Sequence, residues 1–454
     1  MTTNQLAVDF LVIGAGMAGL TAAARAAAAG CSVALVERGP ATGGSAAMSG
    51  GVLWQPASRE ALAAIDPLGD PALIDVFFAR FPEVLTWVRG LGIEVDEPTP
   101  VLIYGLGRLI DVIGYLRACE RQVTKAGGWV VTDATVDHLI VDDGAVIGAA
   151  VVDRDGSYDV HATTTLLATG GFQGDAETRA RYLGANARRM LVRSNPVSDG
   201  AGLRLGLEAG AATSRHMDGF YGHLMVSPLE VLREADFVRL SQWYCMQSVV
   251  VGKLGHRITD ESNGYPVCAQ AALQEPQPRV AVLFDEHIHT TLAQAASGAR
   301  GLEVIDRIAE AERVGGRVAV ADSWADLCDS VSGWGFDAKQ CLRTIDAYNE
   351  AMTTEDGRTD PPRTNYRRPL TQAPFYAVEA QPAITFTMGG LRIDDSTRVL
   401  DTRGVPISGL YAAGADSGGT FAHGYGGGLA LGSVTGLVAA EQAAARAASP
   451  AVLR

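Results

Sequence analysis

Residues 8–19 read Val8-Asp9-Phe10-Leu11-Val12-Ile13-Gly14-Ala15-Gly16-Met17-Ala18-Gly19, an apolar run that leads into a glycine-rich turn. An Ala-rich segment follows, and a second apolar run ends at Glu37. Such glycines let the backbone approach a pyrophosphate, and the helix that follows presents free N–H groups to the phosphates. Glu37 stands close to the position of the acid that binds a ribose hydroxyl. The stretch therefore predicts a dinucleotide-binding βαβ unit.

Composition limits the class of protein. The chain has 454 residues, 47% hydrophobic and 19% charged, which is enough for a large core and two or three structural units. Its formal net charge of -14 argues against a nucleic acid or an anionic membrane as partner. Residues 20–30 are too short to cross a bilayer, and residues 1–9 lack the basic start of an export signal. We expect a cytoplasmic protein with no membrane insertion.

The cysteines and the order of segments describe the rest of the chain. The six cysteines form no CxxC pattern, so we expect buried thiols and neither a metal site nor an iron–sulfur cluster nor attached haem. Strand-like runs return after the middle of the chain, whereas the middle mixes helices and loops rich in aromatic residues. The sequence predicts an α/β fold: a discontinuous Rossmann-like nucleotide-binding domain, 1–213 and 381–454, with an inserted α+β cap domain for the substrate, 214–380.

The identity of the nucleotide follows from what the sequence lacks. One GxGxxG turn does not separate NAD from FAD. A flavoprotein that is reduced by a pyridine nucleotide normally carries a second such turn, and the run Gly424-Tyr425-Gly426-Gly427-Gly428 has no strand before it. This layout favours a single bound FAD.

Several motifs in order resemble the flavoprotein family of soluble fumarate reductases and 3-ketosteroid Δ1-dehydrogenases over nearly the whole chain. Besides the opening turn with Glu37, they are Gly43-Gly44-Ser45 through Ser49-Gly50-Gly51, Ala168-Thr169-Gly170-Gly171, Ser198-Asp199-Gly200, Thr387-Met388-Gly389-Gly390 and Gly409-Leu410-Tyr411-Ala412-Ala413-Gly414. The resemblance implies bound FAD, a discontinuous FAD domain and a mobile cap over the flavin ring.

The resemblance also implies which residues hold FAD. Glu37 would bind the adenosine ribose, and Ala415 stands where the family often has an acid, so that Asp416 would replace it. No histidine lies within 43–51, where relatives attach FAD covalently, and we expect noncovalent FAD. The expected FAD-binding residues are Gly14, Gly16, Ala18, Gly19, Glu37, Arg38, Gly44, Ser45, Ser49, Gly50, Gly51, Val136, Ala168, Thr169, Gly170, Asp199, Gly414, Asp416, Gly428, Leu429, Ala430 and Leu431.

The substrate site departs from the fumarate reductases of this family. Their arginines are replaced by the stretch Ser262-Asn263-Gly264-Tyr265 and by Tyr425, and their histidines before Thr387 by Thr385 and Phe386. A carboxylate in a closed site needs charge-assisted partners, which neutral side chains do not supply. The sequence therefore disfavours a dicarboxylate substrate.

By resemblance to the ketosteroid dehydrogenases, Tyr265 would remove an α-proton, while Tyr425 and the N–H of Gly428 would polarise a ketone. The predicted reaction is α,β-dehydrogenation of a 3-ketosteroid or another cyclic ketone with hydride transfer to flavin N5, or the reverse ene-reduction of an enone. The glycine run lacks the proline typical of ketosteroid enzymes, so the substrate need not be a steroid. Oxygen, a quinone or a redox protein all remain possible electron acceptors.

Two alternatives stay open. A reductase of an unsaturated carboxylic acid would need Arg108, Arg239 or Arg392 at the flavin, and a non-catalytic FAD-binding subunit would bind flavin without turnover. Further candidates for substrate contact are Tyr104, Tyr221, Tyr244, His216 and His223, whereas Arg257 and Glu261 are expected to form a structural ion pair.

Overall fold

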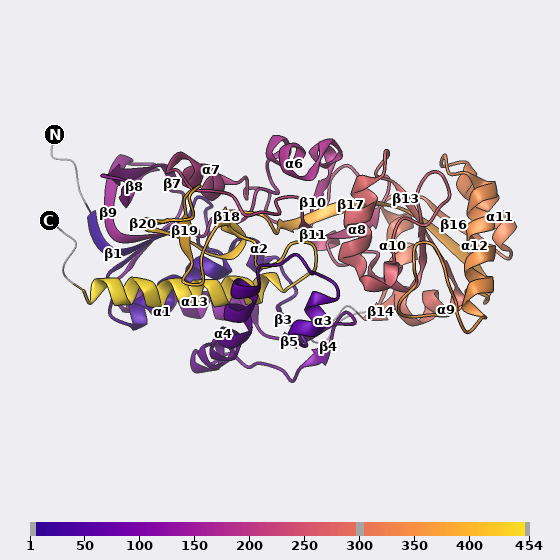
Figure 1. The fold of residues 1–454 in the computed structure, drawn as a ribbon, viewed down its shortest axis with the longest axis horizontal. Coiled ribbons are helices and arrows are strands. Elements are labelled where there is room, and N and C mark those ends of the chain that lie inside the picture. Colours follow the sequence, from indigo (N-terminus) through magenta and orange to yellow (C-terminus); the bar gives the residue numbers. More distant parts are fainter. Residues whose placement is uncertain (1–5, 297–303, 450–454) are drawn as a thin grey trace. The chain divides into compact units, whose positions relative to one another are not determined.

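The computed structural model describes residues 6–296 and 304–449. It divides into two compact units (Figure 1). Unit 1 comprises Met1–Thr178, Asn195–Gly219 and Phe386–Arg454, and unit 2 comprises Arg179–Ser194 and Phe220–Thr385. Unit 1 is therefore assembled from three separate pieces of the chain.

Unit 1 is built on an eight-stranded sheet. Five of its strands run parallel in the order β20, β9, β1, β2, β6, and β19 closes one edge antiparallel. The interior of β1 is fully buried at Phe10, Leu11 and Val12, as expected of a parallel strand covered on both faces. The hairpin of β7 and β8 turns at Asp143 and Gly144 and joins the sheet through β9.

Helices α1 and α13 pack directly against each other in unit 1 (Figure 1). A Cβ on Gly436 would lie 2.4 Å from the carbonyl oxygen of Ala18, and one on Gly432 would lie 3.4 Å from the nitrogen of Ala18. Glycine at these two positions lets the helix backbones approach closely. The amino-terminal halves of both helices are thereby held beside the glycine-rich turn.

Unit 1 also contains a second, three-stranded sheet with the order β3, β5, β4. The elements of unit 1 are β1 (Leu6–Ile13), α1 (Met17–Ala28), β2 (Val33–Val36), α2 (Gly44–Ala47), β3 (Val52–Pro56), α3 (Arg59–Ala63), α4 (Pro71–Gly90), β4 (Thr99–Pro100), β5 (Gly105–Leu109), α5 (Val112–Lys125), β6 (Trp129–Val131), β7 (Thr135–Asp142), β8 (Ala145–Asp153), β9 (Gly156–Leu167), α7 (Ala201–Glu208), β18 (Leu391–Arg392), β19 (Arg398–Leu400), β20 (Pro406–Ala412), β21 (Ser417–Gly418) and α13 (Gly428–Ala447); α6 (Ala176–Leu183) crosses from unit 1 into unit 2.

Unit 2 has a six-stranded sheet centred on β17, which pairs with β10, β11, β13 and β16, while β12 pairs with β13. Every residue of β13 is buried. The elements are β10 (Leu191–Val192), β11 (Phe220–Val226), β12 (Val249–Val251), α8 (Tyr265–Gln274), β13 (Val280–Asp285), α9 (Glu286–Ile288), β14 (Gln294–Ala296), β15 (Val304–Asp306), α10 (Arg307–Arg313), β16 (Val318–Ala321), α11 (Trp324–Ser332), α12 (Ala338–Met352) and β17 (Phe375–Thr387), whose last two residues belong to unit 1.

The predicted α/β architecture with an inserted second unit is confirmed, and the unit boundaries add one detail. Residues 179–194 lie in unit 2, although the sequence places them in the first domain. The reason is that β10 pairs with β17 and that the Asn186 amide donates to the carbonyls of Leu273 and Glu275 in unit 2. All six cysteines are buried and free of disulfides. Residues 1–5, part of the stretch in which no export signal is expected, lie outside the described ranges. No helix in the described ranges is both long and apolar enough to span a membrane.

Candidate functional site

The glycine turn after β1 has the geometry of a phosphate cradle. Gly14 has φ +101°, and a Cβ there would lie 2.3 Å from the carbonyl oxygen of Ala168. A Cβ on Gly19 would lie 1.8 Å from the carbonyl oxygen of Gly14, whereas one on Gly16 would meet no atom within 4 Å. Gly14 and Gly19 thus serve the turn and its packing, and Gly16 leaves open space at the amino end of α1. These residues fit the pyrophosphate of a dinucleotide.

This division of roles predicts two different effects of substitution. Gly16→Val should lower FAD affinity about 10-fold or more, because its side chain would fill the space over the helix N-terminus, while unfolding of the flavin-free protein stays unchanged. Gly19→Ala should instead destabilise the fold, because its Cβ would overlap a backbone oxygen. Flavin titration and urea unfolding of both variants separate the two effects, and equal loss of stability in both would contradict the assignment.

Glu37 follows β2 and lies against the same turn. Its carboxylate accepts from the backbone N–H of Ala15 at 2.8 Å and of Gly39 at 2.7 Å. Arg38 next to it donates to Asp199 at 2.8 Å and to the carbonyl of Val197. The role of Glu37 in binding a ribose remains a prediction, but the structure places its carboxylate beside the cradle.

The second glycine segment also reaches the turn. Gly43 donates its N–H to the carbonyl of Ala15 at 2.7 Å, and a Cβ on Gly44 would lie 3.3 Å from the Cα of Gly16. Ser45 accepts from the N–H of Asn195 at 3.2 Å through its hydroxyl. Gly44 therefore lies beside Gly16, and Ser45 next to it contacts Asn195. Further along this segment, Ser49 and Gly50 lead to Gly51, which has φ +72° and whose carbonyl accepts from the N–H of Ile110, between β5 and α5. Val136, another residue expected to bind FAD, is buried in β7.

Asp416 ties the loop after β9 to the segment after β20. Its carboxylate accepts from the N–H of Thr169 and from the Thr169 hydroxyl, at 3.2 Å for the latter. Burial raises the pKa of Asp416 to about 7, against the opposing effect of these hydrogen bonds. Gly414 nearby donates to the Thr435 hydroxyl of α13 at 2.9 Å. Asp416 thus holds Ala168–Gly170 in place, in the position expected to line FAD.

The raised pKa of Asp416 predicts a pH-dependent stability. Between the pKa of an unfolded aspartate, near 3.9, and about 7, the folded protein holds a proton that the unfolded chain has lost. Stability therefore falls as pH rises through this window and levels off above it. From about pH 6 to pH 8 we expect a loss near 1.4 kcal/mol in urea unfolding at fixed flavin occupancy. Asp416→Asn should remove that dependence; an unchanged slope would contradict the assignment.

The amino end of α13 carries the residues expected at the flavin ring. Gly428, Leu429, Ala430 and Leu431 form its first turn, and no side chain of the described residues caps it. The Tyr425 ring packs on Trp54 with centroids 4.8 Å apart. The Tyr104 hydroxyl accepts from the N–H of Tyr425 at 3.0 Å and lies 3.2 Å from its carbonyl oxygen. Tyr104 thus holds the Tyr425 backbone, a role that the sequence did not suggest.

Tyr265 begins α8 in unit 2 and contacts two residues of β11. Its hydroxyl lies 3.2 Å from that of Tyr221, which lies 3.0 Å from Nε2 of His223. The His223 ring stacks on Tyr265 with centroids 4.4 Å apart and planes 22° from parallel. Tyr221 and His223 project from the same face of β11 because they are two residues apart in a strand.

Burial determines the protonation of this cluster. Burial, with the nearby positive charge of Arg193 as a second cause, holds the pKa of His223 well below its ordinary value. Burial also raises the pKa of Tyr221, while the charge of Arg193 and the hydrogen bond with Tyr265 oppose that rise. Arg193 directly follows β10 and donates to the carbonyl of Phe237 at 3.0 Å. His223 is therefore a neutral imidazole at physiological pH.

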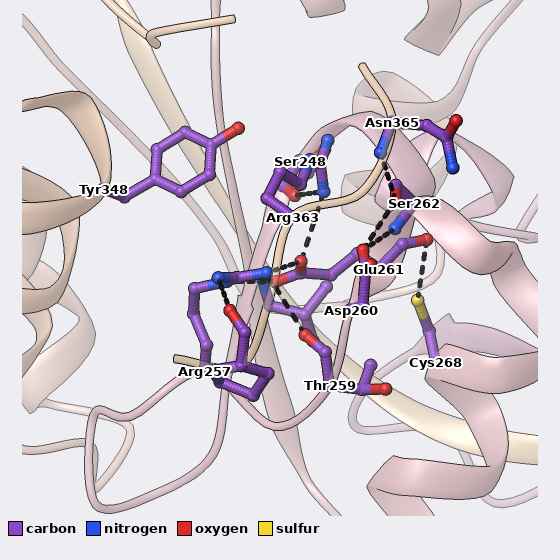
Figure 2. Close-up of polar contacts among 12 residues, drawn as sticks. Ser248, Arg257, Thr259, Asp260, Glu261, Ser262, Cys268, Tyr348, Arg363 and Asn365 are labelled. Atoms are coloured by element: carbon purple, nitrogen blue, oxygen red, sulfur yellow. Dashed lines mark hydrogen bonds and ion pairs between the residues drawn. The ribbon is translucent and has the colours of Figure 1, made fainter. Parts of the chain in front are cut away.

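A buried ion-pair network precedes Tyr265 along the chain (Figure 2). Glu261 accepts from Arg257 through Nε at 3.0 Å and Nη2 at 2.5 Å, and from Arg363 at 3.1 Å. Asp260 accepts from the N–H and hydroxyl of Thr364. The expected Arg257–Glu261 pair is confirmed. The network fastens the loop before α8 to residues 361–365 and so fixes the start of the helix that carries Tyr265.

Other candidates have different surroundings. Tyr244 is fully buried, donates to Gln242 and packs on Phe284, so it is a core residue. The ring centroids of His216 and His423, both in unit 1, lie 6.1 Å apart.

Among the arginine candidates, Arg239 pairs with Glu310 at 2.8 Å and Arg392 is exposed. Arg108 pairs with Leu53 in the β3–β5 register, so it faces away from Trp54, which is opposite Gly107.

The structure brings a subset of the cofactor candidates together around the turn after β1, namely Gly14, Gly16, Gly19, Glu37, Gly44 and Ala168. Gly51 and Val136 contact other parts of unit 1, and Tyr265 and Tyr425 belong to different units. The sequence missed two features of the site. The support of Tyr265 by Tyr221 and His223 is signalled only by their i, i+2 spacing, and Arg193 carries no motif. Both depend on contacts between segments that are far apart in the chain.

Comparison with known proteins identifies the family. The family model described as FAD binding domain matches residues 9–435. NADH:fumarate oxidoreductase of Klebsiella pneumoniae is 26% identical over 97% of this chain and 48% of its own, and vinyl phenol reductase of Lactiplantibacillus plantarum is 26% identical over 92% and 91%. The structure of 3-ketosteroid-Δ4-(5α)-dehydrogenase from Rhodococcus jostii RHA1 in complex with 4-androstene-3,17-dione superposes with TM-score 0.76, 22% identity and 97% coverage of both chains.

The chain belongs to the FAD binding domain family. It spans about half the length of the Klebsiella relative, while it covers most of the vinyl phenol reductase. The predicted family resemblance and the FAD cofactor are confirmed. The chain is an FAD-dependent oxidoreductase.

Proposed function

We propose that this protein transfers a hydride and a proton across a CH–CH bond next to a carbonyl group, with a ketone or enone as substrate. The hydrogen-bonded set of Tyr265, Tyr221 and neutral His223 carries this proposal. A hydroxyl group at the end of such a set, here that of Tyr265, can exchange a proton with the carbon next to a carbonyl. The similarity to a reductase of a neutral vinyl phenol supports an uncharged substrate.

The roles of the residues follow from their chemistry. Tyr265 takes the α-proton onto its phenolate oxygen, and the Tyr425 hydroxyl with the N–H of Gly428 donates to the carbonyl oxygen, where negative charge develops. The electron pair of the broken Cα–H bond forms the double bond as the β-hydride departs. FAD, when bound at the cradle of unit 1, supplies the acceptor of that hydride in dehydrogenation and its donor in reduction. Noncovalent attachment remains part of the proposal.

An anaerobic substrate screen tests the function. The purified flavoprotein is mixed with 4-androstene-3,17-dione, cyclohexanone and fumarate in turn, and the absorbance of oxidised flavin is followed. Bleaching by either ketone, through dehydrogenation of a saturated CH–CH bond next to its carbonyl, supports the proposal, as does reoxidation of dithionite-reduced flavin by 4-androstene-3,17-dione. Reaction with fumarate alone contradicts it, and reaction with none of them in either direction favours a non-catalytic FAD-binding subunit.

Reduction of an unsaturated carboxylic acid is a second candidate function. The observation in its favour is Arg193, whose charge lies near Tyr221 and His223, together with the relative named for fumarate. Its guanidinium already donates to Phe237 and Thr385. If an acid is the substrate, Arg193→Lys should raise its KM strongly, because a bidentate contact is lost; a ketone substrate should be little affected.

A further inference from the structure

The direction of the hydrogen bonds in the Tyr265 cluster can be read from His223. Its side chain is 6% exposed, and its Nδ1 is buried without a hydrogen-bond partner among the described residues. Orphaned buried N–H groups are rarer than under-satisfied acceptors, so the ring proton belongs on Nε2, where the Tyr221 oxygen accepts it at 3.0 Å. The Tyr221 hydroxyl then has its own proton for the Tyr265 oxygen at 3.2 Å.

We propose that His223 and Tyr221 form a directed relay, in which His223 Nε2–H donates to the Tyr221 oxygen and the Tyr221 hydroxyl donates to Tyr265, and that this relay stabilises Tyr265 as the phenolate base. The inference deepens the proposed function and rests on it. Tyr221 and His223 are positioning residues, because they act through Tyr265. They keep their own protons: the α-proton adds to the Tyr265 oxygen, which becomes a phenol.

Two physical effects favour this arrangement. A hydrogen bond to an ionised oxygen is stronger than one to a neutral oxygen, so a donor aimed at Tyr265 favours its phenolate. The Tyr221 donor is itself strengthened when its oxygen accepts from His223. Arg193, the charged group beside this pair, adds positive potential from the segment after β10. Because burial keeps His223 neutral, the relay holds the same polarity across the physiological pH range.

A pair of substitutions at one position separates this role from ordinary packing. Glutamine can place an amide N–H near the position of Nε2 and does not titrate, whereas leucine fills the space without a donor. His223→Gln should therefore keep the relay, and His223→Leu should break it. Tyr221→Phe removes the middle hydroxyl and serves as a second test if His223→Leu fails to fold. Tyr158→Phe in unit 1, which lies outside the cluster, is the matched control.

The readout is the ionisation of Tyr265 in the holoenzyme, which needs no turnover. In each background, the tyrosinate absorbance of the Tyr265→Phe version is subtracted during an alkaline titration. We expect the Tyr265 midpoint to be the same in the parent and in His223→Gln, and to rise by about one to two pH units in His223→Leu and Tyr221→Phe. The pH midpoint of the rate of flavin reduction by a reactive ketone should shift in the same order among the variants.

Each outcome decides a separate claim. An unchanged midpoint in the folded Tyr221→Phe and His223→Leu proteins would overturn the relay. A His223→Gln protein that behaves like His223→Leu would also overturn it, since it would make the imidazole a proton acceptor instead of a fixed donor. If no ketone reacts but the midpoints shift as expected, the proposed function fails, while the hydrogen-bond relay to Tyr265 is supported. If a ketone reacts and the midpoints stay fixed, the proposed function is supported and the relay is overturned.

Discussion

Replacing Tyr265 with phenylalanine is expected to slow flavin reduction by a reactive ketone about 10²- to 10⁴-fold, the range that a positioned general base contributes. The substitution removes one oxygen and keeps the ring that stacks on His223. FAD content should therefore stay the same, because the cradle lies in unit 1. Single-turnover stopped-flow measurement under anaerobic conditions gives the rate directly, free of the electron acceptor.

The control for this prediction is Tyr376→Phe. Tyr376 also lies in unit 2, and its hydroxyl donates to Glu286 at 2.6 Å, away from the Tyr265 cluster. Its loss should leave the flavin reduction rate within about twofold, because the buried Tyr376 ring is kept and the lost hydroxyl bonds to Glu286, outside the Tyr265 cluster. Should Tyr265→Phe reduce flavin as fast as the parent, the proton would leave through another group, and Tyr425 would be the next residue to replace.

The sequence predicts the architecture well because the fold depends on local patterns. The glycine turn and the acid after β2 are each encoded by neighbouring residues, and the structure places Glu37 against the turn, where it accepts from the N–H of Ala15. The boundary of the inserted unit is harder to place. Residues 179–194 join unit 2 through pairing with β17, nearly two hundred positions later in the chain.

The candidate site also has one part that the sequence predicts and another that it does not. Gly44 lies next to Gly16 because the segment after β2 returns to the glycine turn, where the N–H of Gly43 donates to the carbonyl of Ala15. The surroundings of Tyr265 could not be predicted in detail. Tyr221 and His223 come from a strand more than forty residues earlier, and which side chains meet the Tyr265 hydroxyl depends on how β11 packs on α8. The sequence shows residue types, but not these contacts.

Replacing Glu261 with glutamine is expected to lower the free energy of unfolding by about 3–5 kcal/mol, the usual cost of breaking a buried ion pair. The Glu261 carboxylate is fully buried and accepts from Arg257 and Arg363 (Figure 2). It also accepts from the N–H of Val250. Without its charge, two buried guanidinium groups lose their shared counter-ion. The glutamine NH₂ would also bring donors against donors. Urea unfolding followed by tryptophan fluorescence measures the loss.

A second glutamate that also stands four residues after its arginine provides the control. Glu208 pairs with Arg204 at i, i+4, as Glu261 does with Arg257, but both side chains are about half exposed. Glu208→Gln should cost at most about 0.5 kcal/mol, because solvent screens an exposed pair. Double-mutant cycles on the two pairs compare their coupling. Equal coupling would mean that the network adds little to stability, and the start of α8 with Tyr265 would then depend on packing instead of charge.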